Sequence, residues 1–286
     1  MPAILNHIQS ELKDFYPEGE VKAFTRLLLE KVAGWTLTDI LTHDDLELSD
    51  EQTLFIHQAV ERLKEYEPIQ YILGETEFCG MRLWIDNRVL IPRPETAELI
   101  DWIVETVHHS KPTILDVGTG SGCITIALAN KFRKATVTGF DISLDALHLA
   151  HENAELNDLL INFFHINILK TTHWDNTFDV IVSNPPYIMA SERKEMEKNV
   201  LNYEPEIALF VTDDNPLIFY KHIGQFAAQH LNKDGQLFLE INQALSKETT
   251  LLLKEIGFKT VELRKDLSGK NRMIRALLTK PKEKTA

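Results

Sequence analysis

Cysteine is scarce in this chain. Only Cys79 and Cys123 occur among its 286 residues, far apart and outside any metal-ligand spacing, so we interpret both as ordinary buried thiols in a reducing cytosol. The eleven histidines include no HExxH motif and no cluster with cysteine. The sequence therefore predicts no metal site.

Long apolar runs and basic charge are also lacking. No apolar stretch approaches the ~18 to 20 residues needed to span a bilayer, and the N-terminus lacks the charged head, apolar core and cleavage site of a signal peptide. Lysine and arginine number 30 against 43 acidic residues, a net charge of -13, which leaves no broad basic face for nucleic-acid phosphates. The acidic balance suits a basic protein partner or simply solubility. We therefore expect a cytoplasmic monomer that binds neither membrane nor nucleic acid directly.

Apolar residues before position 67 recur at helical spacing, which predicts a helical bundle. Gly34 is expected to end one helix. Ser49 and Gln52 have the spacing of a capping box that opens the next, and Pro68 is expected to close it. Nothing in this region offers chemistry. We expect a small helical domain over residues 1–74 that recognises the substrate, with a purely stabilising role as the alternative.

The pattern then turns to strands. TEFCGMRLWI and RVLI, within residues 75–92, predict a hairpin-like connector. Beyond it, the short apolar runs TILDV, TVTGFD, FDVIVS and QLFLEI alternate with helical stretches, which predicts a mostly parallel sheet with helices on both faces. The last strands, KTVELR and RMIRALL, are close enough in sequence to pair antiparallel at one edge. We expect an α/β catalytic domain over residues 93–280 and a disordered tail at 281–286.

A glycine-rich loop, Gly118-Thr119-Gly120-Ser121-Gly122, follows the strand TILDV and opens a helix near Cys123. Alternate glycines allow a tight turn and let a ligand approach the backbone, while the helix N-terminus offers free N–H groups to an anionic group. A dinucleotide site would place the third glycine one step later. The G-x-G-x-G spacing is the form seen in class I methyltransferases, where the loop wraps the methionine part of S-adenosylmethionine. A glycine-rich turn without a ligand is the alternative.

Asp141 ends the second strand, ATVTGFD, roughly twenty residues after the glycine loop. In doubly wound folds, an acid at this position accepts hydrogen bonds from ribose hydroxyls. A helix cap is the alternative role, but Ser143 already fits it for a helix that begins at Leu144. We therefore predict that Asp141 binds the ribose of the cofactor.

A second loop, Asn184-Pro185-Pro186-Tyr187, follows the strand FDVIVS. Its prolines fix φ and remove two N–H donors, which leaves a stiff backbone with free carbonyls. An amide nitrogen is a poor nucleophile because its lone pair is delocalised, so its methylation requires acceptors that hold both N–H hydrogens. Asn184 Oδ1 and the Pro185 carbonyl can supply them, and the Tyr187 ring can pack on the planar amide. This predicts methyl transfer to a planar nitrogen without a general base, with a proline-rich turn as the alternative.

With both loops in place, the chain resembles the HemK/PrmC family of protein glutamine methyltransferases over nearly its full length. The likeness is carried by PIQYI with Gly74, by FCG, VLIPRPET, DVGTGSG and NPPYI, and by YEP with Ala208 and Leu209. It implies an N-terminal helical domain and a class I, Rossmann-like catalytic domain with a seven-stranded sheet. It also implies methyl transfer from S-adenosylmethionine to the glutamine of the Gly-Gly-Gln motif in class 1 peptide chain release factors, which supports translation termination and leaves S-adenosylhomocysteine.

The resemblance assigns roles by position. Gly118 to Gly122, Asp141 and Asn184 match the family's cofactor contacts. Asn184 to Tyr187 match its amide-binding loop, which includes the prolines Pro185 and Pro186. The catalytic residues it implies are Asn184, Pro185 and Tyr187.

The chain departs from the family pattern at three positions. Ala97 stands where an acid usually follows the PET tripeptide. Asn167 stands where aspartate is common beside the adenine amine, and it can still accept through its side-chain oxygen. Ile168 replaces a frequent aromatic residue, so adenine is expected to be held by apolar packing. These differences concern adenine binding and leave the reaction unchanged.

Three other functions remain as alternatives. A sister enzyme acts on a glutamine of a large-subunit ribosomal protein, but that family usually has serine where Pro94 stands. A nucleic-acid adenine methyltransferase also uses NPPY, because the exocyclic amine of adenine is planar and conjugated, yet it would need a basic channel. A scaffold that only binds S-adenosylmethionine would leave NPPY without a purpose.

Overall fold

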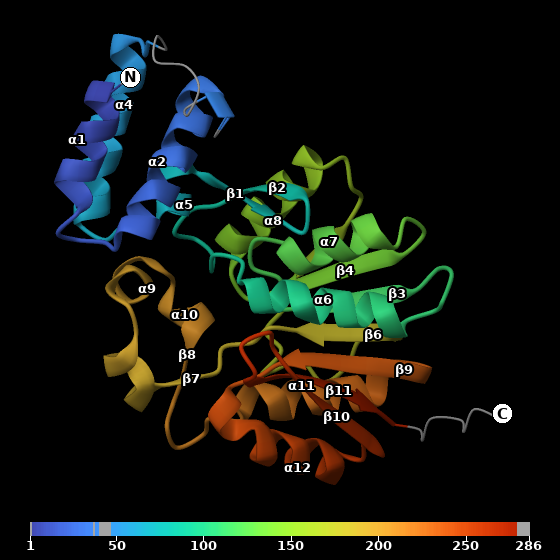
Figure 1. Ribbon diagram of the computed structural model, residues 1–286. Coiled ribbons are helices and arrows are strands. Elements are labelled where there is room, and N and C mark those ends of the chain that lie inside the picture. The colour runs from blue at the N-terminus through green and yellow to red at the C-terminus, as the bar shows by residue number, and fades with distance from the viewer. Residues whose placement is uncertain (1, 37, 40–46, 279–286) are drawn as a thin grey trace, which may run out of the picture. The chain divides into compact units, whose positions relative to one another are not determined.

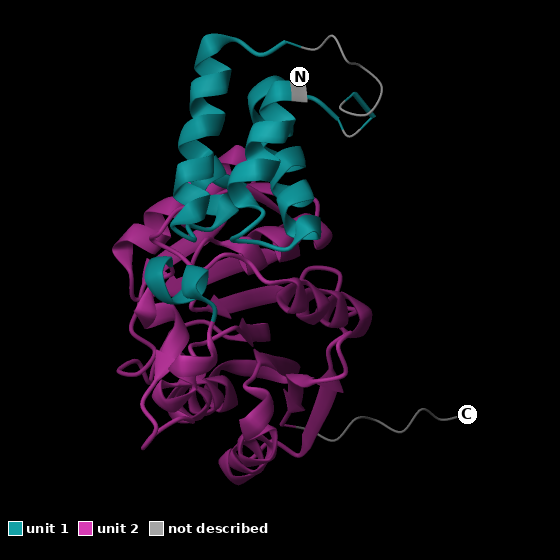
Figure 2. Ribbon diagram, turned by 60° about the vertical axis from the view of Figure 1, so that its left-hand side comes forward, with its two compact units in different colours: residues 1–75, 197–203 teal, residues 76–196, 204–286 magenta. Residues whose placement is uncertain are grey.

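The computed structural model describes residues 2–36, 38–39 and 47–278, and the tail predicted at 281–286 lies outside them. The chain divides into two compact units (Figure 2). Unit 1 consists of Met1–Glu75 and Glu197–Tyr203, and unit 2 of Thr76–Met196 and Glu204–Ala286. Unit 1 therefore includes a second, distant stretch of the chain, which no sequence pattern indicated.

Unit 1 is helical (Figure 1) and contains α1 (Pro2–Leu12), α2 (Glu18–Ala33), α4 (Asp50–Lys64), α5 (Ile69–Leu73) and α9 (Lys198–Tyr203). Its core is formed by apolar residues at helical spacing, and those with no exposed surface include Ile8, Leu12, Leu28, Leu29, Ile56 and Leu63. Short isolated helices are marginal in water, so the packing of these faces stabilises them.

Most helix ends in unit 1 follow their sequence signals. Gly34 ends α2 in the left-handed conformation, with φ 69°. The capping box is confirmed, because Ser49 Oγ accepts from the Gln52 N–H (3.2 Å) and the Gln52 side chain accepts from the Ser49 N–H (2.9 Å). The prediction for Pro68 is wrong: α4 already ends at Lys64, and Pro68 directly precedes α5. Proline is tolerated at a helix start, where an N–H has no intrahelical partner.

Helix α9 contacts the end of α4. The Lys198 ammonium lies 4.6 Å from the centroid of the Tyr66 ring, and the Tyr203 hydroxyl donates to the Glu65 carbonyl (3.0 Å). A cation over an aromatic ring and a hydrogen bond to a helix end together hold this short helix in unit 1.

Unit 2 is built on a seven-stranded sheet in the order β10-β11-β9-β6-β3-β4-β5. The strands are β3 (Thr113–Val117), β4 (Thr136–Asp141), β5 (Asn162–His165), β6 (Phe178–Ser183), β9 (Leu231–Glu240), β10 (Thr260–Lys265) and β11 (Asn271–Leu277). The strands from β9 to β5 are parallel to one another, whereas β11 is antiparallel to both β9 and β10. The predicted α/β sheet and its antiparallel edge pair are confirmed.

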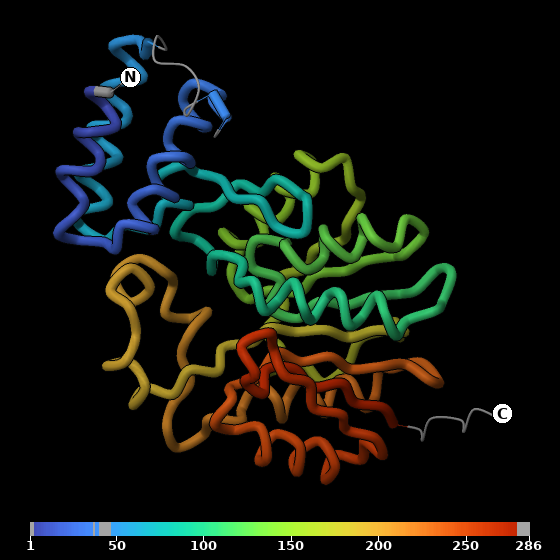
Figure 3. Tube along the Cα trace, viewed as in Figure 1, coloured from blue at the N-terminus to red at the C-terminus, as the bar shows by residue number. Residues whose placement is uncertain are grey.

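Helices cover both faces of this sheet (Figure 1), and Figure 3 follows the alternation of strand and helix along the chain. One layer contains α6 (Pro94–Thr106), α7 (Cys123–Lys131) and α8 (Leu144–Leu156), and the other contains α11 (Ile218–His230) and α12 (Ser246–Ile256). Neighbouring residues of β9 face opposite layers. The Phe238 ring lies 5.7 Å from that of Trp102 on α6, whereas Leu237 and Leu239 share a core cluster with Ile223 of α11. Burial on both faces explains why the central strands are continuously apolar.

Two strand assignments differ from the prediction. The edge strand β5 was not predicted, because its side chains are largely exposed and carry no apolar alternation. RVLI was expected to be a strand, but residues 88–91 form none. Instead the Arg88 N–H and guanidinium both bind the Asp86 carboxylate, which turns the chain before Pro92. The predicted hairpin is limited to β1 (Glu75–Phe78) and β2 (Met81–Trp84).

Several short elements complete unit 2. They are β7 (Ile188–Met189), which pairs with β8 (Phe210–Val211), together with η1 (Ala190–Glu195), α10 (Glu206–Leu209) and η2 (Gln243–Leu245). Cys79 and Cys123 were expected to be buried, but each is partly exposed, and partial burial raises the pKa of the Cys79 thiol to about 11. Within the described residues, no helix combines the length and the apolar composition required to cross a bilayer.

Candidate active site

A cavity of about 240 Å³ opens at the carboxyl ends of β3, β4 and β6, the edge where parallel sheets bind ligands. Ten of the site residues predicted from the sequence line it: Gly118, Thr119, Gly120, Ser121, Asp141, Asn167, Ile168, Asn184, Pro185 and Pro186. The two loops that were interpreted separately therefore share one cavity. Gly122 and Tyr187 are not among the lining residues.

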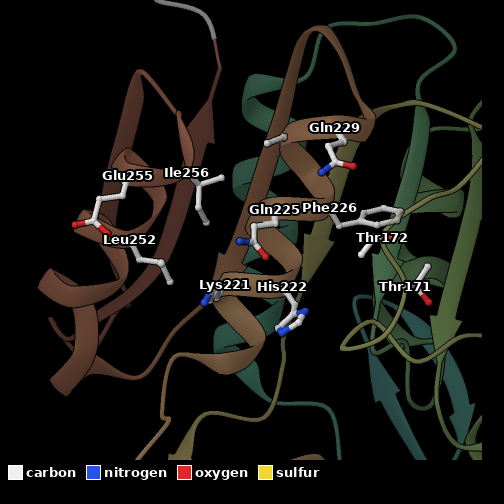
Figure 4. Close-up of a pocket in the computed structure, with 11 residues that line it drawn as sticks. Thr171, Thr172, Lys221, His222, Gln225, Phe226, Gln229, Leu252, Glu255 and Ile256 are labelled. Atoms are coloured by element: carbon white, nitrogen blue, oxygen red, sulfur yellow. The ribbon is translucent and has the colours of Figure 1, made fainter.

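A second hollow, of about 700 Å³, lies between α11, α12 and Thr171 with Thr172 (Figure 4). Figure 4 shows Leu252 and Ile256 of α12 on one side of it, with Gln225 of α11 between them and the two threonines. It contains none of the predicted site residues. We therefore place the candidate site in the smaller cavity.

The lack of a side chain serves different purposes at the three glycines of the loop. All adopt positive φ, with values of 78° for Gly118, 54° for Gly120 and 81° for Gly122. A Cβ at Gly118 or Gly120 would meet no protein atom within 4 Å, so both leave open space along the cavity wall. A Cβ at Gly122 would lie 3.2 Å from Ile126 Cδ1 and 3.3 Å from Ala150 Cβ. Gly122 thus permits close packing of α7 on α8.

Asp141 braces the glycine loop as well as facing the cavity. Its Oδ2 accepts from the Gly120 N–H (2.8 Å) and its Oδ1 from the Ser143 N–H (2.9 Å). Ser143 Oγ accepts from the Ala146 N–H (3.1 Å), so Ser143 caps α8 as predicted. Each carboxylate oxygen can accept a further hydrogen bond, which leaves capacity for a ribose diol. Burial raises the pKa of Asp141, and the backbone N–H groups it binds oppose this.

Sequence reasoning missed Asp116, which precedes the loop inside β3. Its carboxylate is fully buried, and neither oxygen accepts a hydrogen bond from the described residues. Burial raises its pKa to about 7. Ser121 Oγ, at the cavity wall, likewise has no hydrogen-bond partner among the described residues. An acid inside the otherwise apolar run TILDV was the available signal, because a buried carboxylate requires a partner of opposite polarity.

These groups fit S-adenosylmethionine. Ser121 leaves a hydroxyl at the cavity wall, Asp116 places a buried carboxylate in the strand just before the glycine loop, and Asp141 offers acceptors for a ribose. Ile168 packs into the core and also lines the cavity. Asn167 Oδ1 already accepts from the Leu169 N–H (2.9 Å) and retains one further acceptor position.

Asn184 follows β6 and is held by its amide nitrogen. The Nδ2 group donates to Thr96 Oγ1 (3.1 Å), a residue of the IPRPET segment on α6. None of the described residues donates a hydrogen bond to its Oδ1, and Asn184 lines the cavity together with the glycine loop. The preceding Ser183 hydroxyl donates to the Val117 carbonyl (2.6 Å), so the two loops start from strand ends that are bonded together.

Tyr187 lies behind the acceptor loop. Its hydroxyl donates to Glu240 Oε1 (3.0 Å), and its carbonyl accepts from Asn242 Nδ2 (3.1 Å). Burial, with the nearby Glu240 carboxylate as the second cause, raises the pKa of Tyr187. The phenol therefore stays neutral and acts as a donor.

An ion pair joins two segments of the cavity rim. Arg93 Nη2 lies 2.6 Å from Glu204 Oε1, and Glu204 Oε2 accepts from the Ile91 N–H (3.1 Å). Glu204 is buried, so its charge is balanced within the protein. This contact brings the IPRPET and YEP segments together in the structure.

Comparisons with known proteins agree with this geometry. Residues 97–203 match the Methyltransferase small domain, and residues 3–74 match the PrmC N-terminal domain. The chain is 44% identical over 270 residues to a release factor glutamine methyltransferase of Flavobacterium psychrophilum, covering 92% of this chain and 94% of that protein. For the protein of the same name from Bacteroides thetaiotaomicron, the identity is 40% over 277 residues, with coverage of 96% and 99%.

A solved structure supports the fold alone. The hMettl16 catalytic domain, in complex with MAT2A 3′UTR hairpin 6, matches with a TM-score of 0.58 and 16% identity, covering 82% of this chain and 84% of that chain. The predicted class I methyltransferase fold is confirmed by this likeness and by the seven-stranded sheet.

Proposed function

The chain belongs to the release factor glutamine methyltransferase family, and we propose that it methylates the side-chain nitrogen of the Gly-Gly-Gln glutamine in class 1 peptide chain release factors. S-adenosylmethionine is the methyl donor in this proposal, and S-adenosylhomocysteine is the product. The enzyme acts in the cytoplasm as a monomer, with the release factor as its protein partner.

One observation carries the proposal. The amide nitrogen of Asn184 is occupied by Thr96, so Asn184 offers its oxygen to the cavity that the glycine loop also lines. A primary amide presents two N–H donors, and Asn184 Oδ1 with the Pro185 carbonyl provides two acceptors. Holding both hydrogens turns the nitrogen lone pair toward the cofactor side, and preorganised acceptors of this kind stabilise the charge that develops on nitrogen.

S-adenosylmethionine, when bound, supplies an electrophilic methyl group. Gly118 and Gly120 leave room for its methionine part, Asp116 balances the ammonium group, and Asp141 accepts from the ribose. Pro186 stiffens the acceptor loop, and the Tyr187 side chain, fixed by Glu240, supports it from behind. None of these residues is required to remove a proton before transfer.

The charges around the cavity favour a protein substrate over a nucleic acid. Its two basic lining residues are Arg88 and Arg93, and each is paired at 2.6 Å, with Asp86 and Glu204 respectively. Phosphate binding needs basic side chains that are free to make the contact. Unit 1, none of whose described residues lines the cavity, is then proposed to bind the body of the release factor.

The test is incubation of the enzyme with isotopically labelled S-adenosylmethionine and, separately, a purified class 1 release factor or large-subunit ribosomal proteins. Peptide mass mapping then locates the label. A single methyl group on the Gly-Gly-Gln glutamine supports the proposal. Label confined to a ribosomal protein would assign the sister activity instead.

A further inference from the structure

A buried carboxylate links the two groups that surround the proposed amide site. Glu240 is the last residue of β9 and is 1% exposed. Its Oε2 accepts from the Thr96 hydroxyl (2.7 Å), and its Oε1 accepts from the Tyr187 hydroxyl (3.0 Å). Thr96 in turn lies 3.1 Å from Asn184 Nδ2. A single chain of hydrogen bonds therefore runs from Glu240 through Thr96 to Asn184.

Which groups donate and which accept in this series of hydrogen bonds follows from Glu240. An ionised carboxylate only accepts hydrogen bonds, so the Thr96 hydroxyl must use its single hydrogen to donate to Glu240. Thr96 Oγ1 can then only accept from Asn184. The Asn184 amide is thereby fixed with its NH2 group on Thr96 and its oxygen on the opposite side, because the reverse orientation would place two acceptors against each other.

We propose that Glu240 and Thr96 are positioning residues that fix the orientation of the Asn184 amide, so that its oxygen is the acceptor for the substrate N–H. This inference rests on the proposed function. With the opposite orientation, Asn184 would present a donor to the donors of the glutamine amide, and the substrate would lose one of its two acceptors.

Charges around Glu240 are consistent with its acceptor role. The Arg272 guanidinium lies near it, 3.4 Å from the Tyr187 hydroxyl, and is itself paired with Asp266 at 3.3 Å. Burial raises the pKa of Glu240, and Glu95 adds to this effect, whereas Arg272 opposes it and favours the ionised carboxylate. The hydrogen bonds from the Thr96 and Tyr187 hydroxyls also lower the pKa of Glu240 and favour its ionised form.

The same carboxylate restrains the far end of the loop. Tyr187 is held at its hydroxyl by Glu240 and at its carbonyl by Asn242 Nδ2, which also donates to Glu192 Oε2 (2.9 Å). Both ends of the Asn184–Tyr187 loop are thus connected to β9 and the residues after it. Because Glu240 orients both ends of this loop, we expect it to affect the position of the substrate amide more than the binding of the methyl donor.

The experiment compares Thr96→Val with Thr96→Ser. Valine keeps the shape but removes the hydroxyl, and we expect the turnover number on the release factor to fall roughly 10- to 100-fold while the dissociation constant for S-adenosylmethionine changes less than about twofold. Serine keeps the hydroxyl and should restore most of the activity. Thr249→Val is the matched control, because Thr249 of α12 is also buried and its hydroxyl donates to the Leu245 carbonyl of η2 (2.8 Å), away from the cavity.

A double-mutant cycle separates positioning from general destabilisation. If Thr96 acts through Asn184, Thr96→Val should cause no further loss in the Asn184→Ala background. Glu240→Gln combined with Thr96→Val should likewise be no worse than the more severe single variant. Additive losses in these cycles, or wild-type turnover in Thr96→Val, would overturn the inference.

A spectroscopic measurement tests the inference without any substrate. The side-chain NH2 signals of Asn184, assigned by their absence from Asn184→Ala, should show slow hydrogen exchange in the wild type and in Thr96→Ser. They should exchange fast in Thr96→Val. Equal exchange in wild type and Thr96→Val would refute the fixed orientation, whereas failure of the wild type to methylate any release factor would count against the proposed function alone.

Discussion

Asn184 donates its side-chain NH2 group to the hydroxyl of Thr96 across 3.1 Å, although 88 residues separate the two positions in the chain. This bond joins the end of β6 to the first turn of α6. It brings the IPRPET and NPPY segments together beside one cavity, and it leaves the Asn184 oxygen as the free group. The residue most directly tested by activity is therefore Asn184 itself.

Asn184→Ala should reduce turnover on the release factor by roughly 10²- to 10³-fold, the usual effect of losing one preorganised contact to a developing charge. Cofactor affinity should remain mostly intact, because the glycine loop and Asp141 are unchanged. Single-turnover kinetics and calorimetry measure the two quantities. Near wild-type turnover would mean that Asn184 does not orient the nucleophile.

Asp141→Ala should weaken S-adenosylmethionine binding about 10- to 150-fold, since hydrogen bonds to a charged acceptor are worth roughly 1.5 to 3 kcal/mol. It should also lower the melting temperature, because the Gly120 and Ser143 N–H groups lose their partner. Ser49→Ala is the control: it removes the α4 cap in unit 1, at a cost of about 1 kcal/mol, and should leave affinity unchanged. Equal affinity in wild type and Asp141→Ala would restrict Asp141 to bracing the loop.

Asp116→Asn should stabilise the protein without cofactor while weakening cofactor binding. The pKa of Asp116 is raised from 3.8 to about 7, so the folded protein binds this proton more tightly than the unfolded chain does. This group therefore makes stability fall as pH rises from about 4 to about 7, and the loss is complete above that range. Asp116→Asn does not lose stability in this way, so its melting temperature at pH 8 should exceed that of the wild type by several degrees. Each kcal/mol of unfolding free energy corresponds to about 2–4 °C.

At pH 4 the advantage of Asp116→Asn should largely disappear, because the wild-type carboxyl is then protonated in the folded state. Calorimetric titration at pH 8 should show weaker binding of S-adenosylmethionine by the variant. A variant with the wild-type melting temperature at both pH values would show that Asp116 is not buried as a strained charge.

The proposed role of unit 1 predicts a preference for whole substrates. The enzyme should methylate an intact release factor with a far higher kcat/KM than a short Gly-Gly-Gln peptide, because remote contacts can position the reacting amide. Removing residues 1–66 should abolish most of this preference. The same preference in a truncated enzyme that still binds cofactor would contradict the recognition role.

The structure adds a necessary control to that truncation. Removing residues 1–66 also deletes Tyr66 and Glu65, which contact Lys198 and Tyr203 of α9. Tyr203→Phe removes one of these contacts in the full-length enzyme and should leave the preference for intact substrate unchanged. A loss of preference in Tyr203→Phe alone would show that the order of α9, and not docking on unit 1, decides it.

Local signals were sufficient for much of the fold. The capping box at Ser49, the left-handed Gly34 and the apolar central strands all depend on residues close in sequence or on burial of both sheet faces. The edge strand β5 could not be predicted in this way, because an exposed edge needs no apolar alternation. The expected strand at residues 88–91 failed because buried apolar residues also occur in a turn held by Arg88 and Asp86.

The candidate site could be predicted only where the functional residues are consecutive in one loop. The glycine loop and the NPPY loop are of this kind. The contact of Thr96 with Glu240 joins positions 144 residues apart, and nothing in either local sequence indicates the other. Asp116 was visible as an acid in an apolar strand, but its lack of a partner depends on how the sheet packs around it.

The composition of unit 1 has a consequence for synthesis of the chain. Its first helices leave the ribosome early, yet the Tyr203 contact to Glu65 joins residues 138 positions apart. At about 5–20 residues per second, α9 follows α4 by roughly 7 to 28 s. During that interval β3, β4, β5 and β6 are also synthesised, so unit 1 becomes complete only after four strands of the sheet and the acceptor loop exist. Helices α1 to α5 are therefore made before the sheet, whereas α9 is made in the middle of it, before β9, β10 and β11.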